Sequence, residues 1–159
     1  MASSEPVAES PATSTAGTAV TSLPDRVVFD TEPIVAHATN EPGAETVDAY
    51  LDAVSEGEVS GFVSQVNLAE IRYVIARVYG GADADRYVSW LFDIGIRSVG
   101  TDGVWQSAAE YVLGYGPALG NAFAIATAEQ VDAALLVGAD GDFDGVTEVR
   151  IVRCREEPG

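Results

Sequence analysis

The chain has 159 residues, which is enough for one domain with a substantial core and hardly enough for two. Asp and Glu number 25 against 8 basic residues, all of them Arg, so the net charge is -17 and no basic patch for nucleic acid is visible. No apolar run reaches the length of a membrane span, the N-terminus lacks the features of a secretory signal, and the single cysteine, Cys154, excludes an internal disulfide. We therefore expect a globular, cytoplasmic protein without a membrane partner.

The complete absence of lysine is unusual even for an acidic protein. An excess of carboxylates without lysine resembles the composition of proteins from extreme halophiles, whose surfaces hold hydrated cations at very high salt. At about 1 M salt the electrostatic screening length falls to about 3 Å, so the repulsion between the chain and a polyanion weakens there. The charge therefore says more about the solvent than about the substrate, and it predicts a halophilic protein.

Residues 1–24 are rich in Ala, Ser, Thr, Glu and Pro and contain little to bury, which predicts a disordered N-terminal extension. Beyond it, short β-branched and aromatic runs alternate with segments of helical periodicity. The runs predict strands at residues 26–29, 58–63, 96–99, 135–137 and 148–152. The periodic segments predict helices at residues 31–38, 44–55, 65–79, 82–94, 104–115 and 118–130.

This alternation predicts an α/β protein, built as a three-layer α/β/α sandwich with a central parallel sheet of four or five strands. We expect the domain to span residues 25–155, followed by a short charged tail at residues 156–159. Right-handed crossovers between parallel strands place the carboxyl ends of the strands along one edge of the sheet. Side chains that follow a strand are therefore expected to meet at that edge, where ligands of open α/β sheets bind.

Two carboxylates occupy such positions. Asp30 ends the apolar run at residues 27–29, which reads as a strand buried on both faces, and Asp140 follows the strand predicted at residues 135–137. Asp30 also has a second interpretation, because Asp is a preferred N-cap residue and a helix is predicted from Thr31. Either way, the carboxyl edge of the sheet is predicted to be acidic.

Glu70 is a third candidate, in the helix predicted at residues 65–79. This helix is apolar nearly all round and is expected to be largely buried, where a carboxylate is costly unless it is paired or binds a metal. Arg72 and Arg77 are not at the spacing of three or four residues that would pair them with Glu70, so the alternative is a salt bridge from elsewhere in the chain. The only histidine, His37, is expected on the surface of the first helix.

Phosphodiester hydrolysis is one reaction that uses gathered carboxylates. Magnesium prefers oxygen ligands and keeps several waters, so a few carboxylates suffice to hold it, and the bound ion can activate a water molecule. A phosphate-transfer receiver would also have an acidic edge, but the chain has no lysine to hold a phosphoryl group. No glycine-rich nucleotide-binding loop is present.

Four segments carry a more specific signal. Residues 29–31 (FDT), 66–71 (VNLAEI), 119–126 (LGNAFAIA) and 140–143 (DGDF) resemble, in this order, the successive motifs of the PIN domain family. The resemblance is closest to the ribonuclease toxins of VapBC-type toxin–antitoxin pairs, and it covers residues 26–153. It implies the PIN fold and a metal-dependent ribonuclease.

The resemblance also implies roles for individual residues. The implied catalytic residues, which position water for RNA cleavage, are Asp30, Glu70 and Asp140. The implied ligands of Mg2+ or Mn2+ are these three carboxylates together with Asn121. The implied supporting residues are Thr31, Asn121 and Asp142. The resemblance further implies an RNA substrate, a homodimer and a small antitoxin protein that blocks the active site.

Two residues depart from the family pattern. Members of the family usually have Asp where this chain has Asn121, and commonly have Thr where Gly138 stands. Asparagine keeps an oxygen ligand but loses the negative charge, which weakens metal binding. The leading prediction is therefore a ribonuclease toxin, and the alternative is a weakened or inactive PIN domain that binds RNA or a protein partner.

Overall fold

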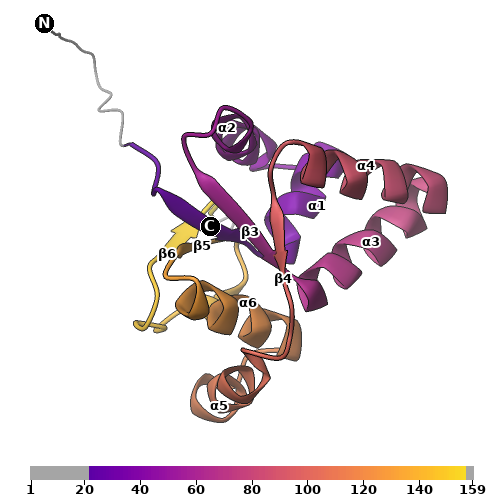
Figure 1. The fold of residues 1–159 in the computed structure, drawn as a ribbon. Coiled ribbons are helices and arrows are strands. Elements are labelled where there is room, and N and C mark those ends of the chain that lie inside the picture. The colour runs from indigo at the N-terminus through magenta and orange to yellow at the C-terminus, as the bar shows by residue number, and fades with distance from the viewer. Residues whose placement is uncertain (1–21, 157–159) are drawn as a thin grey trace, which may run out of the picture.

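The computed structural model describes residues 22–156. Residues 1–21 of the predicted N-terminal extension and residues 157–159 of the predicted tail lie outside the described part of the chain. Figure 1 shows a central sheet with helices on both of its faces.

Each predicted strand and helix is present in the structure. The strands are β2 (Arg26–Phe29), β3 (Ser60–Ser64), β4 (Arg97–Val99), β5 (Ala134–Val137) and β6 (Ile151–Arg153). The α-helices are α1 (Thr31–Thr39), α2 (Ala44–Ser55), α3 (Gln65–Tyr79), α4 (Gly81–Asp93), α5 (Trp105–Tyr115) and α6 (Leu119–Gln130). A short 3-10 helix, η1, covers Gly141–Phe143. The largest boundary difference is in β6, which begins three residues later than the sequence predicted, at Ile151 instead of residue 148.

The five strands form one parallel sheet in the order β4-β3-β2-β5-β6. β2 is central, and Val27, Val28 and Phe29 are each no more than 1% exposed, as expected for a strand covered on both faces. Val27 and Phe29 pack in the core formed with α1 to α4, whereas Val28 packs in the core formed with α5 and α6. The predicted three-layer α/β/α sandwich is therefore confirmed.

The expectation that α3 is largely buried is wrong. Among its apolar residues Ile71 and Ile75 are buried, but Tyr73, Val78 and Tyr79 are 45%, 58% and 49% exposed. The helix packs against α1, α4 and α6, and Figure 1 shows α3 and α4 side by side at one end of the sheet. Because no other element of residues 22–156 covers the outer side of this pair, only one face of α3 enters the core.

Cys154 lies at the end of the described domain and belongs to its core. It is buried directly after β6, and its backbone N–H donates to Val137 O at 2.8 Å. Gly43, with a φ of +98°, lies so close that a β-carbon there would sit 3.0 Å from Cys154 Sγ. The last strand and the turn before α2 therefore pack together without room for a side chain at residue 43.

His37 is more enclosed than a surface residue. Its Nδ1 lies 2.7 Å from the Tyr87 hydroxyl and its Nε2 lies 3.0 Å from Asp48 Oδ1. The imidazole also stacks on Trp90, with the ring planes 2° apart. These contacts join α1 to α2 and α4, so the histidine has a structural role between three helices.

Across residues 22–156, no helix is both long enough and apolar enough to cross a bilayer.

Candidate active site

Asp30 lies at the carboxyl end of the central strand, β2. Its backbone N–H donates to Leu136 O of β5 at 3.0 Å, which holds the residue at the middle of the sheet edge. The side chain is 3% exposed, and its Oδ1 has no hydrogen-bond partner among the described residues. Asp30 occupies the N-cap position of α1 but makes no side-chain capping bond. Helix capping therefore does not account for this carboxylate.

Other carboxylates surround Asp30. The pKa of its carboxyl is raised from 3.8 to about 7, mainly by burial; a hydrogen bond from the Thr31 backbone N–H opposes the shift, and the negative charges of Glu70, Glu32 and Asp140 add to it. A divalent cation would reverse the effects of burial and of these charges, because it would supply opposite charge and fill the open coordination position of Oδ1. The burial of Asp30 and the carboxylates around it are therefore compatible with the role of a cation ligand.

A pocket of about 260 Å³ at this edge brings most of the predicted site residues together. Those that line it are Asp30, Thr31, Glu70, Asn121 and Asp140. Glu32, Glu41 and Tyr73 share the lining and were not among the predicted site residues. Of the predicted set, only Asp142 stays outside the lining.

A hydrogen-bond network holds Glu70 in the pocket. Thr31 Oγ1 donates to Glu70 Oε1 at 2.7 Å, and Asn67 Nδ2 lies 3.1 Å from the same oxygen. Asn67 Nδ2 also lies 3.1 Å from Gly120 O of α6, and Asn67 Oδ1 accepts from Ser64 Oγ at 2.6 Å. No arginine lies within 4 Å of Glu70 in residues 22–156, so the alternative of a structural salt bridge fails.

Asn67 was not predicted as a site residue, although it is completely buried and joins α1, α3 and α6 through Nδ2. The sequence carried one signal for it. Ser64 and Asn67 have the spacing of a helix-capping pair, and Ser64 Oγ does accept from Asn67 N at 3.0 Å. Gly120 has a related role, because a β-carbon there would lie 2.5 Å from Glu70 Oε2. Only glycine lets α6 approach the carboxylate this closely.

Asn121 lies between two carboxylates. Its Nδ2 donates to Asp140 Oδ2 at 3.0 Å and to Asp142 Oδ2 at 2.9 Å. The opposite orientation of the amide would put its oxygen against both carboxylates, so this hydrogen-bond pattern favours the nitrogen in that place. The Asn121 amide therefore donates hydrogen bonds to Asp140 and Asp142. The family's usual Asp at this position would instead add a third negative charge.

Asp142 has a mainly structural environment. It accepts from Ala118 N at 2.9 Å, at the start of α6, as well as from Asn121. These two bonds, led by that from Ala118, lower the pKa of the Asp142 carboxyl. Asp140 in turn accepts from Asp142 N at 2.9 Å, so the loop after β5 and the first turn of α6 are tied together.

Glu32 occupies the space beside Gly138. A β-carbon at residue 138 would overlap the Glu32 carboxylate. This carboxylate accepts from Arg155 Nε at 2.9 Å and from Ala139 N at 3.4 Å. The family commonly has Thr at the position of Gly138. In this chain the Glu32 carboxylate fills the space that a threonine side chain would occupy there.

We expect Gly138→Thr to lower the free energy of unfolding by about 1–3 kcal/mol, the usual cost of overpacking, which is a fall in melting temperature of about 3–8 °C. In a Glu32→Ala background the same substitution should cost much less, because the overlapping carboxylate is gone. Thermal unfolding of the wild type, both single variants and the double variant measures this coupling. An equal cost of Gly138→Thr in both backgrounds would contradict the account.

Arg153 was also missed from the sequence. Its Nη1 donates to Gly138 O at 2.7 Å and to Asp140 O at 3.1 Å, and its Nη2 donates to Asp144 Oδ1 at 2.7 Å. It therefore fixes the backbone of the loop that carries Asp140. Nothing in the local sequence around residue 153 signals this, because the contacts depend on β6 lying next to β5.

The pocket carboxylates lie around a shared space without forming a compact ligand group. Within residues 22–156, no group of three or more Asp, Glu, His or Cys side chains lies close enough together to hold an ion. The donor chemistry nevertheless fits a hard divalent cation, because oxygen atoms line the pocket and Asp30 Oδ1 is unpartnered among them.

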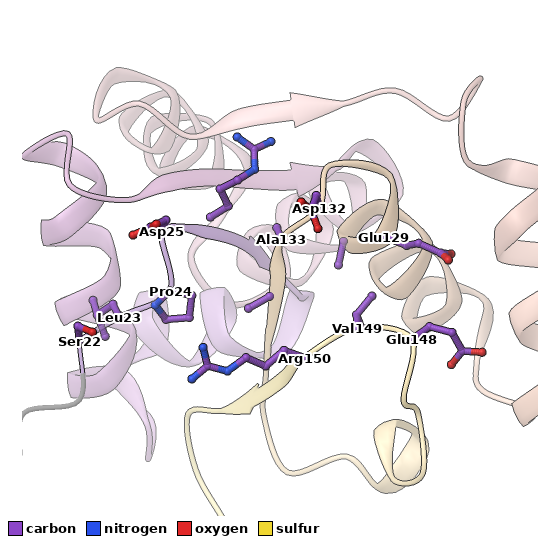
Figure 2. A pocket seen from close by; sticks show the side chains of 13 residues that line it. Ser22, Leu23, Pro24, Asp25, Glu129, Asp132, Ala133, Glu148, Val149 and Arg150 are labelled. Atoms are coloured by element: carbon purple, nitrogen blue, oxygen red, sulfur yellow. The ribbon is translucent and has the colours of Figure 1, made fainter.

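A larger hollow, of about 630 Å³, lies at the amino edge of the sheet and contains no predicted site residue. Its charged lining includes Arg150, Asp25, Glu129 and Glu148. Figure 2 shows Arg150 and Asp25 on one side of this hollow and the tips of Glu129 and Glu148 on the other. Because these groups do not converge on a point, the smaller pocket at the carboxyl edge is the better candidate site.

Solved structures with the same fold come from toxin–antitoxin systems. A toxin–antitoxin complex from Klebsiella pneumoniae is similar at a TM-score of 0.63 and 15% identity, covering 82% of this chain and 99% of that one. VapBC2 from Rickettsia felis, bound to a promoter DNA fragment, gives 0.60 and 12%, covering 80% and 98%. VapC20 of Mycobacterium tuberculosis, a toxin that cleaves the sarcin-ricin loop, gives 0.58 and 17%, covering 78% and 98%.

At these low identities the structural neighbours establish the fold alone. A comparison with curated protein sequences finds no match. The sequence model of the PIN domain matches residues 27–149, which is most of the chain and includes every predicted site residue. The chain therefore belongs to the PIN domain family.

Proposed function

We propose that this protein is a divalent-metal-dependent endoribonuclease and the toxin of a toxin–antitoxin pair. The observation that carries the proposal is the buried Asp30 carboxylate, which has an unpartnered Oδ1 and faces Glu70 and Asp140 across one pocket. An uncompensated carboxylate at this depth is costly, and such costs cluster at functional sites.

The residues of the chain divide into ligands and positioning groups. Asp30, Glu70 and Asp140 would hold Mg2+ or Mn2+, and Asn121 could contribute its amide oxygen only after it gives up the bonds to Asp140 and Asp142. When bound, the cation would activate a water molecule and stabilise the charge that develops on the leaving oxygen. Thr31 and Asn67 orient Glu70, and Arg153 fixes the loop that carries Asp140.

The arrangement around Asn121 also favours a second candidate function. Its amide already bridges Asp140 and Asp142 without a cation, so part of the attraction of these carboxylates for a metal is lost. A PIN domain weakened in this way would bind RNA or a protein partner without cutting. The two candidates differ in a single measurable property, which is metal-dependent cleavage.

Partners and solvent follow from the same proposal. Four of the structural neighbours are solved as toxin–antitoxin assemblies or as complexes with DNA, which supports a small antitoxin as partner of this chain. We further propose that the protein is a homodimer and works in the cytoplasm. We also propose a halophilic host cell, because a net charge of -17 without lysine suits a solvent of high ionic strength.

The function is tested by incubating the protein with structured RNA in about 2 M KCl, with Mn2+, Mg2+ or EDTA. We expect cleavage with either ion and none in EDTA. Glu70→Gln, which is nearly isosteric and keeps the helix intact, should lose at least about 100-fold in rate, because metal-assisted charge stabilisation is worth several kcal/mol. Binding of RNA without cleavage under all these conditions would instead support the non-catalytic candidate.

A further inference from the structure

One face of α3 continues outward from the pocket. Glu70, Tyr73 and Arg77 follow the spacing of three and four residues that places side chains along one side of a helix. Glu70 and Tyr73 both line the candidate pocket. At a rise of about 1.5 Å per residue, Arg77 lies roughly 10 Å further along the helix axis than Glu70.

Tyr73 and Arg77 form an exposed pair on this face. The guanidinium carbon of Arg77 lies 4.8 Å from the centre of the Tyr73 ring, and the tyrosine is 45% exposed. Stacking on the ring holds the guanidinium in place while its N–H donors remain available at the edge of its plane. Such a guanidinium loses little conformational freedom when it binds a phosphate.

Arg77 is one of four arginines that have no carboxylate partner among residues 22–156. Arg72, Arg86, Arg153 and Arg155 each pair with a carboxylate, whereas Arg77 has no carboxylate within 4 Å in the described part of the chain. The other arginines without such a partner are Arg26, Arg97 and Arg150. Arg26 and Arg97 stack on Phe62, and Arg150 lines the hollow at the amino edge of the sheet. Arg77 is therefore the unpaired cation that shares a helix face with a pocket carboxylate.

We propose that this face of α3 is the track on which a single-stranded segment of RNA lies as it leaves the pocket. Arg77 binds a backbone phosphate, and the exposed Tyr73 ring stacks on a base between that phosphate and the scissile one. Because Arg77 lies roughly 10 Å along the helix from Glu70, the phosphate it binds belongs to a nucleotide near the scissile bond but not next to it. The inference rests on the proposed ribonuclease function and names the contacts that hold its substrate.

The chemistry of the face favours RNA over a protein partner. An aromatic ring beside a cation that can bind phosphate is the usual composition of a single-strand binding surface. An apolar anchor of a protein would instead meet Val78 and Tyr79, which lie round the helix from this face at about 100° per residue. In an acidic chain, one cation and one ring also allow binding without a large basic patch.

The test measures the affinity of a fluorescein-labelled RNA hairpin with a single-stranded loop, by anisotropy with Mg2+ present. Asp30→Asn is used as a non-cleaving parent protein, and the substitutions are added to it. We expect Tyr73→Ala to raise Kd about tenfold or more, from the loss of base stacking. Arg77→Gln should raise Kd about fivefold and make the slope of log Kd against log salt shallower by about 0.7, the value for one phosphate contact on a single strand.

Matched variants separate a specific track from diffuse charge. Arg86→Gln removes another exposed arginine, from α4, where it pairs with Asp83, and should change Kd less than twofold. Arg77→Lys keeps the charge and should recover most of the affinity. In the cleaving protein, Arg77→Gln should raise KM and leave kcat nearly unchanged. Circular dichroism of each variant checks the fold.

Three outcomes would overturn the inference. Equal weakening by Arg77→Gln and Arg86→Gln would mean that only net charge matters. An unchanged Kd in both the Tyr73 and Arg77 variants would mean that RNA does not bind this face of α3, which would then be available to a protein partner. The proposed ribonuclease function would still stand. A parent protein that binds no RNA, together with a wild type that cleaves none, would instead refute the proposed function itself.

Discussion

Asp30→Asn is expected to abolish RNA cleavage and, at the same time, to stabilise the metal-free protein at pH 8. The loss in rate should be at least about 100-fold, because the variant lacks the central carboxylate of the proposed metal site. The gain in stability arises because the side chain is 3% exposed, its Oδ1 has no hydrogen-bond partner among the described residues, and burial outweighs the hydrogen bond from the Thr31 backbone N–H. Asparagine has nearly the same shape, so the packing of β2 and α1 should not change.

The pH dependence of this stability follows from the pKa of Asp30. The unfolded chain loses the proton near 3.8 and the folded protein holds it to about 7, so the unfolded state binds fewer protons between these values. The contribution of Asp30 to stability is therefore fully present below about pH 4, falls as the pH rises through this window, and is lost above about pH 7. The difference of about three pH units corresponds to on the order of 4 kcal/mol.

Thermal unfolding in EDTA from pH 4 to pH 8, for wild type and Asp30→Asn, measures this effect. The melting temperature of the wild type should fall relative to that of the variant by several degrees as the pH rises. Adding Mn2+ at pH 8 should raise the melting temperature of the wild type and leave that of the variant unchanged, because a ligand stabilises the state it binds. Parallel pH profiles of the two proteins, or stabilisation of both by Mn2+, would contradict the role of Asp30.

Asn121→Asp is expected to weaken the metal-free protein and to tighten metal binding about tenfold or more. The substitution removes the two hydrogen bonds donated to Asp140 and Asp142 and puts a third negative charge between them. Hydrogen bonds to carboxylates are worth about 1.5–3 kcal/mol when buried and less where solvent reaches them, so a loss of about 1–2 kcal/mol, or about 3–6 °C, is expected in EDTA. The same added charge would attract a cation.

Isothermal calorimetry with Mn2+ at high salt, together with thermal unfolding in EDTA, measures both effects. Asn121→Ala is the control, since it removes the same two hydrogen bonds without adding a charge, and it should destabilise the protein without tightening metal binding. A gain of RNA cleavage in Asn121→Asp would identify Asn121 as the residue that limits the wild type. If metal affinity and melting temperature both stay at the wild-type values, then the two hydrogen bonds from Asn121 neither stabilise Asp140 and Asp142 nor weaken the binding of a cation by them.

Much of the fold was predictable because it depends on neighbours along the chain. The run at residues 27–29 predicted a fully covered strand, and alternation with helical segments predicted the parallel three-layer sandwich. The burial of α3 was mispredicted for the same reason. Its apolar composition is visible locally, but whether a layer of the fold covers its outer face, where Tyr73 and Tyr79 are exposed, is not.

The sequence by itself determined the strands, their parallel arrangement, and the acidic residues that follow them. Hydrophobic periodicity and crossover handedness act over short stretches, so these features can be predicted locally. Only the tertiary structure decided which atoms meet there. Asn121 turns its nitrogen to Asp140, Glu32 fills the space beside Gly138, and Asn67 joins three helices. These contacts link residues 19 to more than 100 positions apart, so they depend on how packed elements fit together, which no local pattern encodes.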